Sequence, residues 1–158
     1  MRAVVQRVRR AAVRVAADTV ASIASGYLVL IGVERGDSAA DVEYVCRKLA
    51  GLRLMADAEG KMNQPLDPAR DAVLAVSQFT LMGDTRRGLR PSFDSAAPPE
   101  QARPLYEAVV DGLRRQRLRV ETGVFQADMQ VELVNDGPVT VIVDSRHNRE
   151  TDAESEML

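Results

Sequence analysis

The sequence has few of the side chains on which most enzymes depend. It contains one cysteine, Cys46, and one histidine, His147, among 158 residues. A single cysteine excludes an internal disulfide and is typical of a reducing compartment, so we expect a cytoplasmic protein. With one histidine, in an acidic C-terminal tail, we predict neither a Ser-His-Asp nor a Cys-His arrangement, no zinc site, and no cofactor. An enzyme of this composition has to use hydroxyl groups, backbone groups or the substrate itself.

Signals for membranes and for large ligands are also missing. No apolar run approaches the ~20 residues of a membrane-spanning helix, and the first residues alternate like a strand and do not resemble a signal peptide. No glycine-rich loop has the spacing of a P-loop or a dinucleotide site. The net charge is −2, and because the last twelve residues carry −3, the body carries +1. That charge argues against DNA or long RNA as a partner, although an RNA end remains compatible with it.

Hydrophobic periodicity predicts one domain over residues 1–145 and a disordered acidic tail over 146–158. A helix is expected to begin at Ser38, which with Asp41 resembles a capping box, and to be stopped by Gly51, with Cys46 as a buried structural thiol. A second helix is expected from Pro98 to Leu113. We predict an α/β protein with curved mixed, largely antiparallel sheets that form a barrel-like core, and two main helices packed on one side. The expected strands cover residues 4–9, 11–15, 19–24, 26–33, 52–55, 72–79, 118–121, 129–134 and 139–144.

The first candidate site segment follows the apolar run at 72–76 and contains Ser77, Gln78, Phe79 and Thr80. We predict that the strand ends at Phe79 and Thr80, so that their backbone N–H groups are partly free. Such groups can hold a developing oxyanion without any titrating side chain. Thr80 has no evident adjacent base, which a nucleophilic threonine needs. A polar strand end with a core phenylalanine explains the same residues without a function.

The second candidate segment, residues 135–140, places Gly137 and Pro138 between two β-branched runs. Proline removes a backbone donor and fixes φ, and glycine permits close approach of another chain. The segment therefore either presents its backbone to a ligand or forms a tight turn between two strands, with the usual trans peptide bond. The residues alone leave both open.

Arginines mark two further places. Arg86, Arg87 and Arg90 form a basic cluster on a long connection at 83–98, and a long loop in a compact domain is often functional. These side chains are either solvated or in contact with phosphates. Arg7 lies inside a strand that otherwise packs, so we expect it to pair with a backbone carbonyl or a carboxylate.

Together these segments resemble the D-aminoacyl-tRNA deacylase family. The similar segments keep the family's order and spacing from residue 1 to about 145, and such collinearity is far more specific than any single motif. They are Met1–Val8, Gly60–Asn63, Ser77–Leu81, Gly83–Arg86, Arg90–Phe93, Pro104–Tyr106, Val120–Gly123 and Asn135–Thr140.

The resemblance implies a homodimer that hydrolyses the ester between a D-amino acid, and by implication glycine, and the 3′ end of tRNA. In that family the Gly-Pro peptide is cis and reaches into the partner subunit's active site. Its two carbonyls collide with an L side chain, so that chirality is read by exclusion. By this resemblance Gly137 and Pro138 are the chiral gate, supplied in trans, and Arg7 braces them.

The resemblance also assigns roles within the pocket. Phe125 and Met129 would flank the terminal adenine, and the 2′-hydroxyl of the terminal ribose would assist the attack on an ester that is already activated. The loop arginines would contact nearby phosphates. One departure is Gln126, where we would expect glycine. The pocket-lining segment carried over is Ser77, Gln78, Phe79 and Thr80, with the backbone N–H groups near Phe79 and Thr80 as the oxyanion site.

Two other functions fit the same residues. The first is a hydrolase in which Thr80 is a covalent nucleophile, which would lose activity on Thr80→Ala and keep some on Thr80→Ser. The second is a module that binds an aminoacylated RNA end and never releases the amino acid.

Overall fold

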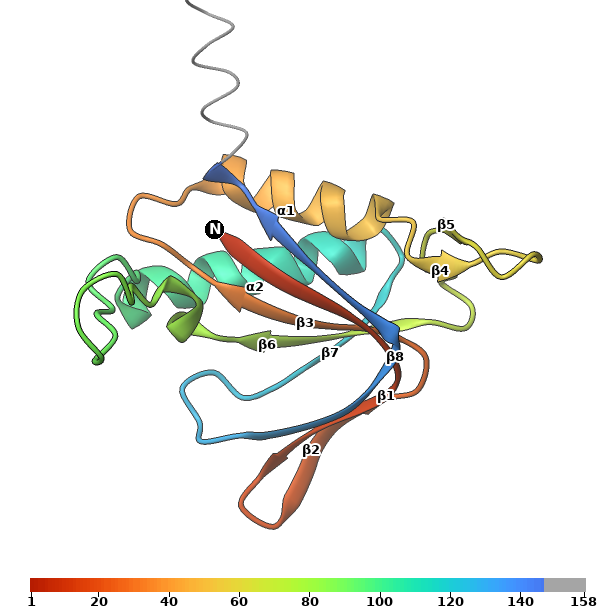
Figure 1. Cartoon of the computed structure of the whole chain (residues 1–158), viewed down its shortest axis with the longest axis horizontal. Coiled ribbons are helices and arrows are strands. Elements are labelled where there is room, and N and C mark those ends of the chain that lie inside the picture. The colour runs from red at the N-terminus through yellow and green to blue at the C-terminus, as the bar shows by residue number, and fades with distance from the viewer. Residues whose placement is uncertain (147–158) are drawn as a thin grey trace, which may run out of the picture.

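One curved sheet organises the chain, and both long helices lie against the same face of it (Figure 1). The structure is a computed structural model, and it describes residues 1–146. The six-stranded sheet has the order β2-β1-β3-β6-β7, with β8 paired to β1. Its strands are β1 (Arg2–Val15), β2 (Asp18–Ile23), β3 (Gly26–Gly32), β6 (Ala72–Ser77), β7 (Arg119–Thr122) and β8 (Gln130–Asp144). The remaining elements are α1 (Ala39–Gly51), α2 (Pro99–Arg115), the 3-10 helix η1 (Phe79–Met82), and the small sheet of β4 (Met55–Ala56) and β5 (Met62–Gln64).

The direction of the strands explains the position of the helices. β3 pairs with β6 and β6 with β7 in parallel, whereas β1 pairs with β2, β3 and β8 in antiparallel fashion. Parallel neighbours need a crossover connection, and α1 and α2 are the helices of the two crossovers. The carboxyl ends of β3, β6 and β7 therefore meet at one edge of the sheet.

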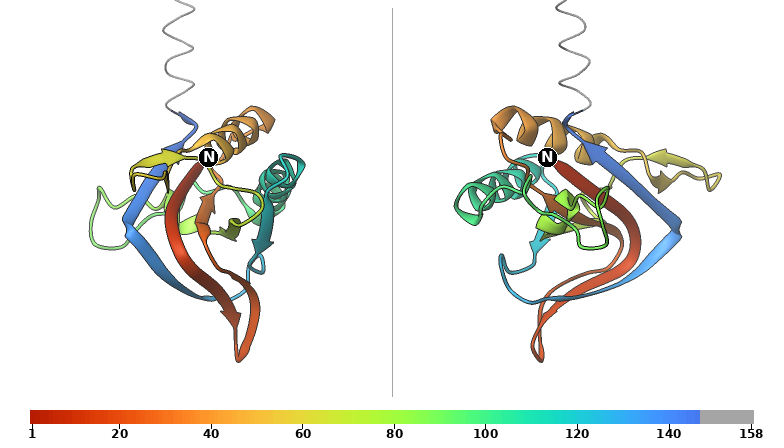
Figure 2. Two further views of the ribbon diagram at one scale, coloured as in Figure 1. Left: turned by 90° about the vertical axis from the view of Figure 1, so that its right-hand side faces the viewer. Right: turned by 60° about the vertical axis from the view of Figure 1, so that its left-hand side comes forward.

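The sheet buries apolar side chains on both faces, which explains its barrel-like shape. One cluster lies between the sheet and the helices and includes Tyr27 and Leu113, both fully buried. A second cluster lies inside the curve and includes Val8, Leu28 and Leu74. Figure 2 shows how strongly β1 and β8 bend, which gives the sheet its curve. The predicted architecture is confirmed, including the central strand at 26–32 that is buried on both faces.

Several predicted boundaries are wrong because pairing partners extend the strands. The two expected N-terminal strands form one strand, β1, and the two expected C-terminal strands form one strand, β8, which pairs with β1 along most of its length. The expected strand at 52–55 is reduced to β4. Gly51 is the last residue of α1 and not a residue beyond it.

The local signals for the first helix are confirmed. Ser38 and Asp41 form a capping box, in which the Ser38 N–H donates to the Asp41 carboxylate over 2.9 Å. Cys46 is buried on α1, and its thiol donates to the carbonyl of Val109. Burial raises the pKa of this thiol, as expected of a structural cysteine.

The C-terminal prediction is only partly covered by the described residues. His147 and the rest of the predicted tail lie outside them. Arg146, which we assigned to that tail, forms salt bridges with Asp144 at 2.7 Å and Glu34 at 3.3 Å. The ordered domain therefore reaches at least this residue. Within residues 1–146, no helix is long and apolar enough to cross a membrane.

The parallel pair of β3 and β6 depends on a glycine. Gly26 pairs with Ala72 and has a φ of +145°, a conformation that L side chains rarely adopt. A Cβ at Gly26 would lie 1.8 Å from the Ala72 carbonyl oxygen, so β6 would have to move away.

We predict that Gly26→Ala lowers the free energy of unfolding by about 3 kcal/mol or more, because it adds both backbone strain and a clash with backbone. Gly51→Ala is the matched control, since a Cβ there meets nothing within 4 Å. The control should be neutral or stabilise by up to about 1 kcal/mol. Urea denaturation followed by circular dichroism measures both, and equal stability of the two variants would contradict the argument.

Candidate functional site

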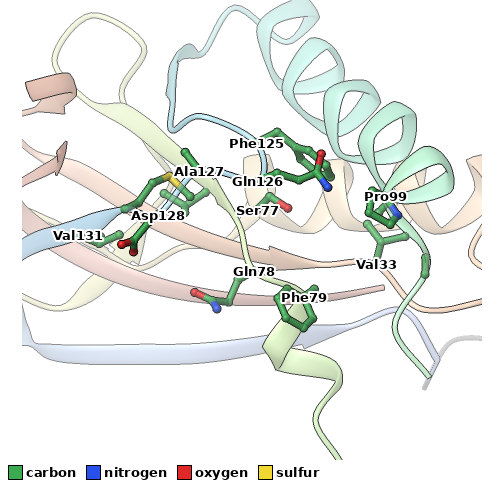
Figure 3. A pocket seen from close by; sticks show the side chains of 14 residues that line it. Val33, Ser77, Gln78, Phe79, Pro99, Phe125, Gln126, Ala127, Asp128 and Val131 are labelled. Atoms are coloured by element: carbon green, nitrogen blue, oxygen red, sulfur yellow. The ribbon is translucent and has the colours of Figure 1, made fainter. Parts of the chain in front are cut away.

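A hollow of about 580 Å³ opens at the carboxyl ends of the parallel strands (Figure 3). Val76 and Ser77 at the end of β6, with Gln78 directly after it, form one wall. Phe125 and Met129 from the connection between β7 and β8 form another, and Pro99 at the start of α2 closes a third side. Crevices at this edge of a parallel sheet are where ligands bind in many α/β proteins.

The structure brings together some of the predicted site residues but not all of them. Five residues from two distant segments line the hollow, namely Ser77, Gln78, Phe79, Phe125 and Met129. Thr80 is adjacent in sequence but is not among the lining residues. The other predicted residues do not line this hollow either. They are Arg7, Arg86, Arg87, Arg90, Gly137 and Pro138.

The segment after β6 differs from the prediction in a way that matters for chemistry. The strand ends at Ser77, and Phe79 and Thr80 begin the 3-10 helix η1 instead of ending the strand. The first N–H groups of a helical turn have no acceptor within the turn. Within residues 1–146, no hydrogen bond engages the backbone N–H of Phe79 or Thr80. These groups are therefore available to a ligand, although a helix start and not a strand end leaves them so.

Two contacts hold this turn in place. The Gln78 N–H donates to the carbonyl of Ile31 at the end of β3, over 2.8 Å. The Gln78 side-chain amide donates to the Thr80 hydroxyl, so both polar side chains are already engaged with each other. A Cβ at Gly32 would lie 3.0 Å from the Gln78 carbonyl oxygen. The position of η1 is thus set by close packing on β3.

Phe79 is not a core residue, so the interpretation of this segment as a polar strand end with a core phenylalanine is wrong. Its side chain is 56% exposed and lines the hollow. The ring packs edge-on against Phe93 of the long loop, with centroids 5.2 Å apart. An exposed apolar side chain that lines a hollow is suited to contact a ligand.

Phe125 is held from the other side by α2. Its ring centroid lies 6.0 Å from that of Tyr106, whose hydroxyl donates to the carbonyl of Ala75 over 2.9 Å. Burial raises the pKa of Tyr106 to about 12, so the hydroxyl stays protonated and donates at every physiological pH. The guanidinium of Arg103 lies over the same ring, 4.6 Å from its centroid.

Sequence reasoning missed one charged residue of the hollow. Asp128 lines it and is the one ionisable residue among the lining residues that the structure describes. Gln126, two residues before Asp128, also lines the hollow. Its side chain is exposed and its φ is +65°. A left-handed conformation at this position agrees with the glycine that we expected there. The sequence could have indicated Asp128, because it lies between Phe125 and Met129, which were both predicted to belong to the site.

Gly137 and Pro138 lie in the middle of β8 and do not form a turn between two strands. On β1, Gln6 pairs with Thr140 and Val8 with Asn135, so four residues of β8 face only Arg7. The segment is thus an unusually long bulge in a continuous strand, and Figure 2 shows β8 bending away from β1 there. The Gly137–Pro138 peptide bond is cis, as the family resemblance implied, and not trans as general frequencies favour.

Arg7 supports the bulge, and its predicted pairing with a carbonyl or carboxylate is confirmed. Its guanidinium donates to the carbonyl of Asp136 over 3.1 Å and to the carbonyl of Leu54 over 2.7 Å. Asn135 closes the other end, donating to the carbonyls of Arg7 and Val139. The segment is thus anchored at both ends while Pro138 itself is exposed.

The loop arginines are exposed and do not behave as one cluster. Arg86 is paired with Asp84 over 2.7 Å, and its hydrogen bonds lower the pKa of Asp84 to about 2. Within the described part of the chain, no ion pair engages Arg87 or Arg90. Two of the three side chains are therefore free for an anionic ligand.

The chemistry of the hollow is limited. Asp128 is its single ionisable side chain among the described lining residues, and no nucleophile-base pair lines it. Among residues 1–146, no group of three or more His, Cys, Asp and Glu side chains is placed to hold a metal ion. What the site offers is apolar and aromatic surface, the polar side chains of Ser77 and Gln78, and free backbone N–H groups.

Comparisons with known proteins agree with this arrangement. The sequence profile of the D-Tyr-tRNA(Tyr) deacylase family matches residues 4–144. A D-aminoacyl-tRNA deacylase of Symbiobacterium thermophilum is 59% identical over 145 residues, covering 92% of this chain and 96% of the relative. One of Anaeromyxobacter dehalogenans is 60% identical over 146 residues, covering 92% and 98%.

Solved structures share the fold. A protein described as the c-Myc DNA unwinding element binding protein superimposes with a TM-score of 0.86 at 38% identity, covering 92% of this chain and 99% of that one. A probable eukaryotic D-amino acid tRNA deacylase superimposes with a TM-score of 0.77, covering 90% and 98%. The second is 18% identical, so it supports the fold alone.

We predict that Arg7→Met lowers the free energy of unfolding by about 2–4 kcal/mol, because it leaves two carbonyls without their charged donor in a site where Arg7 is only 13% exposed. Arg9→Met is the matched control. Arg9 pairs with the same Asp136 over 3.0 Å but is 74% exposed, so its loss should cost less than about 1 kcal/mol.

Urea denaturation gives both values, and amide hydrogen exchange over residues 135–140 reports the bulge itself. Exchange there should accelerate in Arg7→Met and remain unchanged in Arg9→Met. Similar protection in both variants would show that Arg7 does not support the bulge.

Proposed function

This chain belongs to the D-Tyr-tRNA(Tyr) deacylase family, and from that premise we propose that it hydrolyses the ester between a D-amino acid and the 3′ end of tRNA. The observation that carries the mechanism is the pair of unengaged N–H groups of Phe79 and Thr80 beside a hollow with no nucleophile-base pair. An aminoacyl ester is already activated, so positioning and stabilisation of the oxyanion supply most of what its hydrolysis requires.

In the proposed complex, the terminal adenosine lies in the hollow between Phe125 and Met129, with the ester carbonyl near η1. The N–H groups of Phe79 and Thr80 donate to the oxyanion of the tetrahedral intermediate. The 2′-hydroxyl of the terminal ribose assists the attacking water. The Thr80 hydroxyl is engaged by the Gln78 amide, which supports a role in holding η1 and not one as a nucleophile.

Chirality is proposed to be read by Gly137 and Pro138 of a second copy of the chain. Support comes from their position, because the bulge that carries them is exposed and lies outside the chain's own hollow. A gate that acts on the hollow therefore has to be supplied in trans, as a homodimer allows. Two carbonyls facing the aminoacyl α-carbon reject an L side chain by collision, while glycine, which has no side chain, passes as a second substrate.

The remaining assignments follow from the substrate. Arg87 and Arg90, which are free of ion pairs among the described residues, and Arg86 are proposed to contact phosphates of the acceptor end. The protein is proposed to act in the cytoplasm, where tRNA is used. DNA is not proposed as a partner, although one structural neighbour is named for binding a DNA element, because the body of this chain carries a charge of only +1.

We predict that the protein deacylates D-Tyr-tRNA in single-turnover reactions and leaves L-Tyr-tRNA intact, with chelator present throughout. A ratio of initial rates above about 100 is expected, because collision with backbone costs several kcal/mol in the transition state for the L ester. Survival of both esters would favour the RNA-end binding module. Cleavage of both at similar rates would mean that Gly137 and Pro138 do not act as the gate.

A second prediction separates the proposed mechanism from a covalent threonine. Thr80→Ala should lower the single-turnover rate by less than about tenfold, since the N–H groups of Phe79 and Thr80 remain while η1 loses one side-chain contact. A substrate whose terminal adenosine lacks the 2′-hydroxyl should react more than about 100-fold more slowly with the wild-type protein. Abolition of activity by Thr80→Ala, with partial activity in Thr80→Ser, would instead establish the covalent nucleophile.

A further inference from the structure

Phe125 lines two hollows and not one. The first is the pocket described above, and the second, about 470 Å³, lies between α2 and the end of β7. Arg103, Glu107 and Arg114 project into the second hollow from α2, and Thr122 and Val124 border it. A ligand that fills the first hollow and continues past Phe125 therefore enters a second one of similar size.

The two arginines of the second hollow differ in how they are engaged. Arg114 donates to the carbonyl of Val120 over 2.9 Å and lies 3.8 Å from the carboxylate of Asp111. Arg103 is exposed, and no hydrogen bond or ion pair engages it among the described residues. Its guanidinium lies over the face of the Phe125 ring, 4.6 Å from the centroid. Stacking on a ring leaves the N–H donors of a guanidinium free at its edge. A planar cation is thus held, with its donors unused, where the two hollows meet.

From this geometry, and resting on the function proposed above, we propose that the second hollow binds the penultimate nucleotide of the tRNA 3′ end. Arg103 then donates to the phosphate that joins this nucleotide to the terminal adenosine. Phe125 separates the two nucleosides, so the linking phosphate has to pass the ring on which Arg103 is stacked. Arginine binds phosphate oxygens through two parallel N–H groups, which matches this placement.

Glu107 gives the second hollow an acceptor for the base. It lies one turn after Arg103 on α2 and lines the same hollow, yet no salt bridge joins the two within residues 1–146. A carboxylate accepts hydrogen bonds from the amino group of cytosine, which is the penultimate base of every tRNA. Uracil presents an oxygen at that position and would be repelled.

The phosphate contact is tested by a double-substitution cycle in equilibrium binding of an RNA hairpin that ends in CCA and carries no amino acid. The protein change is Arg103→Gln, and the RNA change is a neutral methylphosphonate at the last phosphodiester. Each change alone should weaken binding about tenfold, and the two together should also weaken it about tenfold, because both remove the same contact. Independent effects that multiply to about 100-fold, or no effect of either change, would overturn the proposal.

Two further variants define what Arg103 contributes. Arg47→Gln is the matched control, because Arg47 also lies over an aromatic ring, Tyr44 at 5.6 Å, but on α1 and outside both hollows. It should leave binding unchanged. Arg103→Lys keeps the charge and should recover part of the lost affinity, whereas a lysine variant as weak as the glutamine variant would contradict a phosphate contact.

The alternative that Arg103 merely positions Phe125 is tested with D-tyrosyl-adenosine, which has no phosphate. Arg103→Gln should lower kcat/KM about tenfold for D-Tyr-tRNA and leave hydrolysis of D-tyrosyl-adenosine unchanged. Equal losses on the two substrates would overturn the phosphate contact. The base contact is tested with a hairpin that ends in CUA, which the wild-type protein should bind less well than the CCA hairpin, and Glu107→Ala should remove that preference. Equal binding of both hairpins by the wild-type protein would overturn the placement of the base.

These tests remain decisive if the proposed function fails. The hairpin carries no ester, so its binding does not depend on deacylation. A protein that hydrolyses neither substrate but shows the non-additive cycle would retain the second hollow as an RNA subsite and lose the proposed reaction. A protein that deacylates D-Tyr-tRNA but shows an additive cycle would retain the reaction and lose the subsite.

Discussion

The parallel pairing of β3, β6 and β7 is the constraint on which the rest of the structure depends. It requires two crossovers, so it brings α1 and α2 to one face of the sheet and leaves the carboxyl ends of three strands at one edge. Gly26 allows β3 and β6 to approach closely, and at the other end of the pair the Ile31 carbonyl accepts from Gln78. The hollow and the free N–H groups of η1 are both consequences of where this pairing stops.

The antiparallel half of the sheet supplies the second feature of the molecule. β1 and β8 pair along most of their length, and the bulge opposite Arg7 is the one place where β8 departs from that register by several residues. Arg7 holds the bulge to the body while Asn135 closes it, so an exposed segment of backbone is kept in a defined position. One half of the sheet therefore carries the hollow, and the other presents the anchored bulge outside it. The proposed dimer gives that separation a purpose.

Prediction from sequence succeeded where the signal was local. The capping box at Ser38 and the buried thiol of Cys46 follow from helical periodicity and from short-range hydrogen bonds. Prediction failed where the outcome depended on a distant partner. The predicted strand at 72–79 is too long, because β6 ends at Ser77, where its pairing with Ile31 of β3 stops. The residues around Gly137 and Pro138 predicted a turn as readily as a ligand contact, because no local signal indicates that β1 continues beside them.

The sequence by itself determined the α/β class, the two helices and the family, because these depend on periodicity, composition and motif order. Only the tertiary structure decided that Phe125 and Met129 join Ser77 to Phe79 around one hollow, that Thr80 and the Gly137–Pro138 bulge lie outside it, and that Asp128 lies within it. It also placed Arg103 over Phe125, between two hollows. Such arrangements depend on pairing and packing between residues far apart in the chain, and no local pattern encodes those distances.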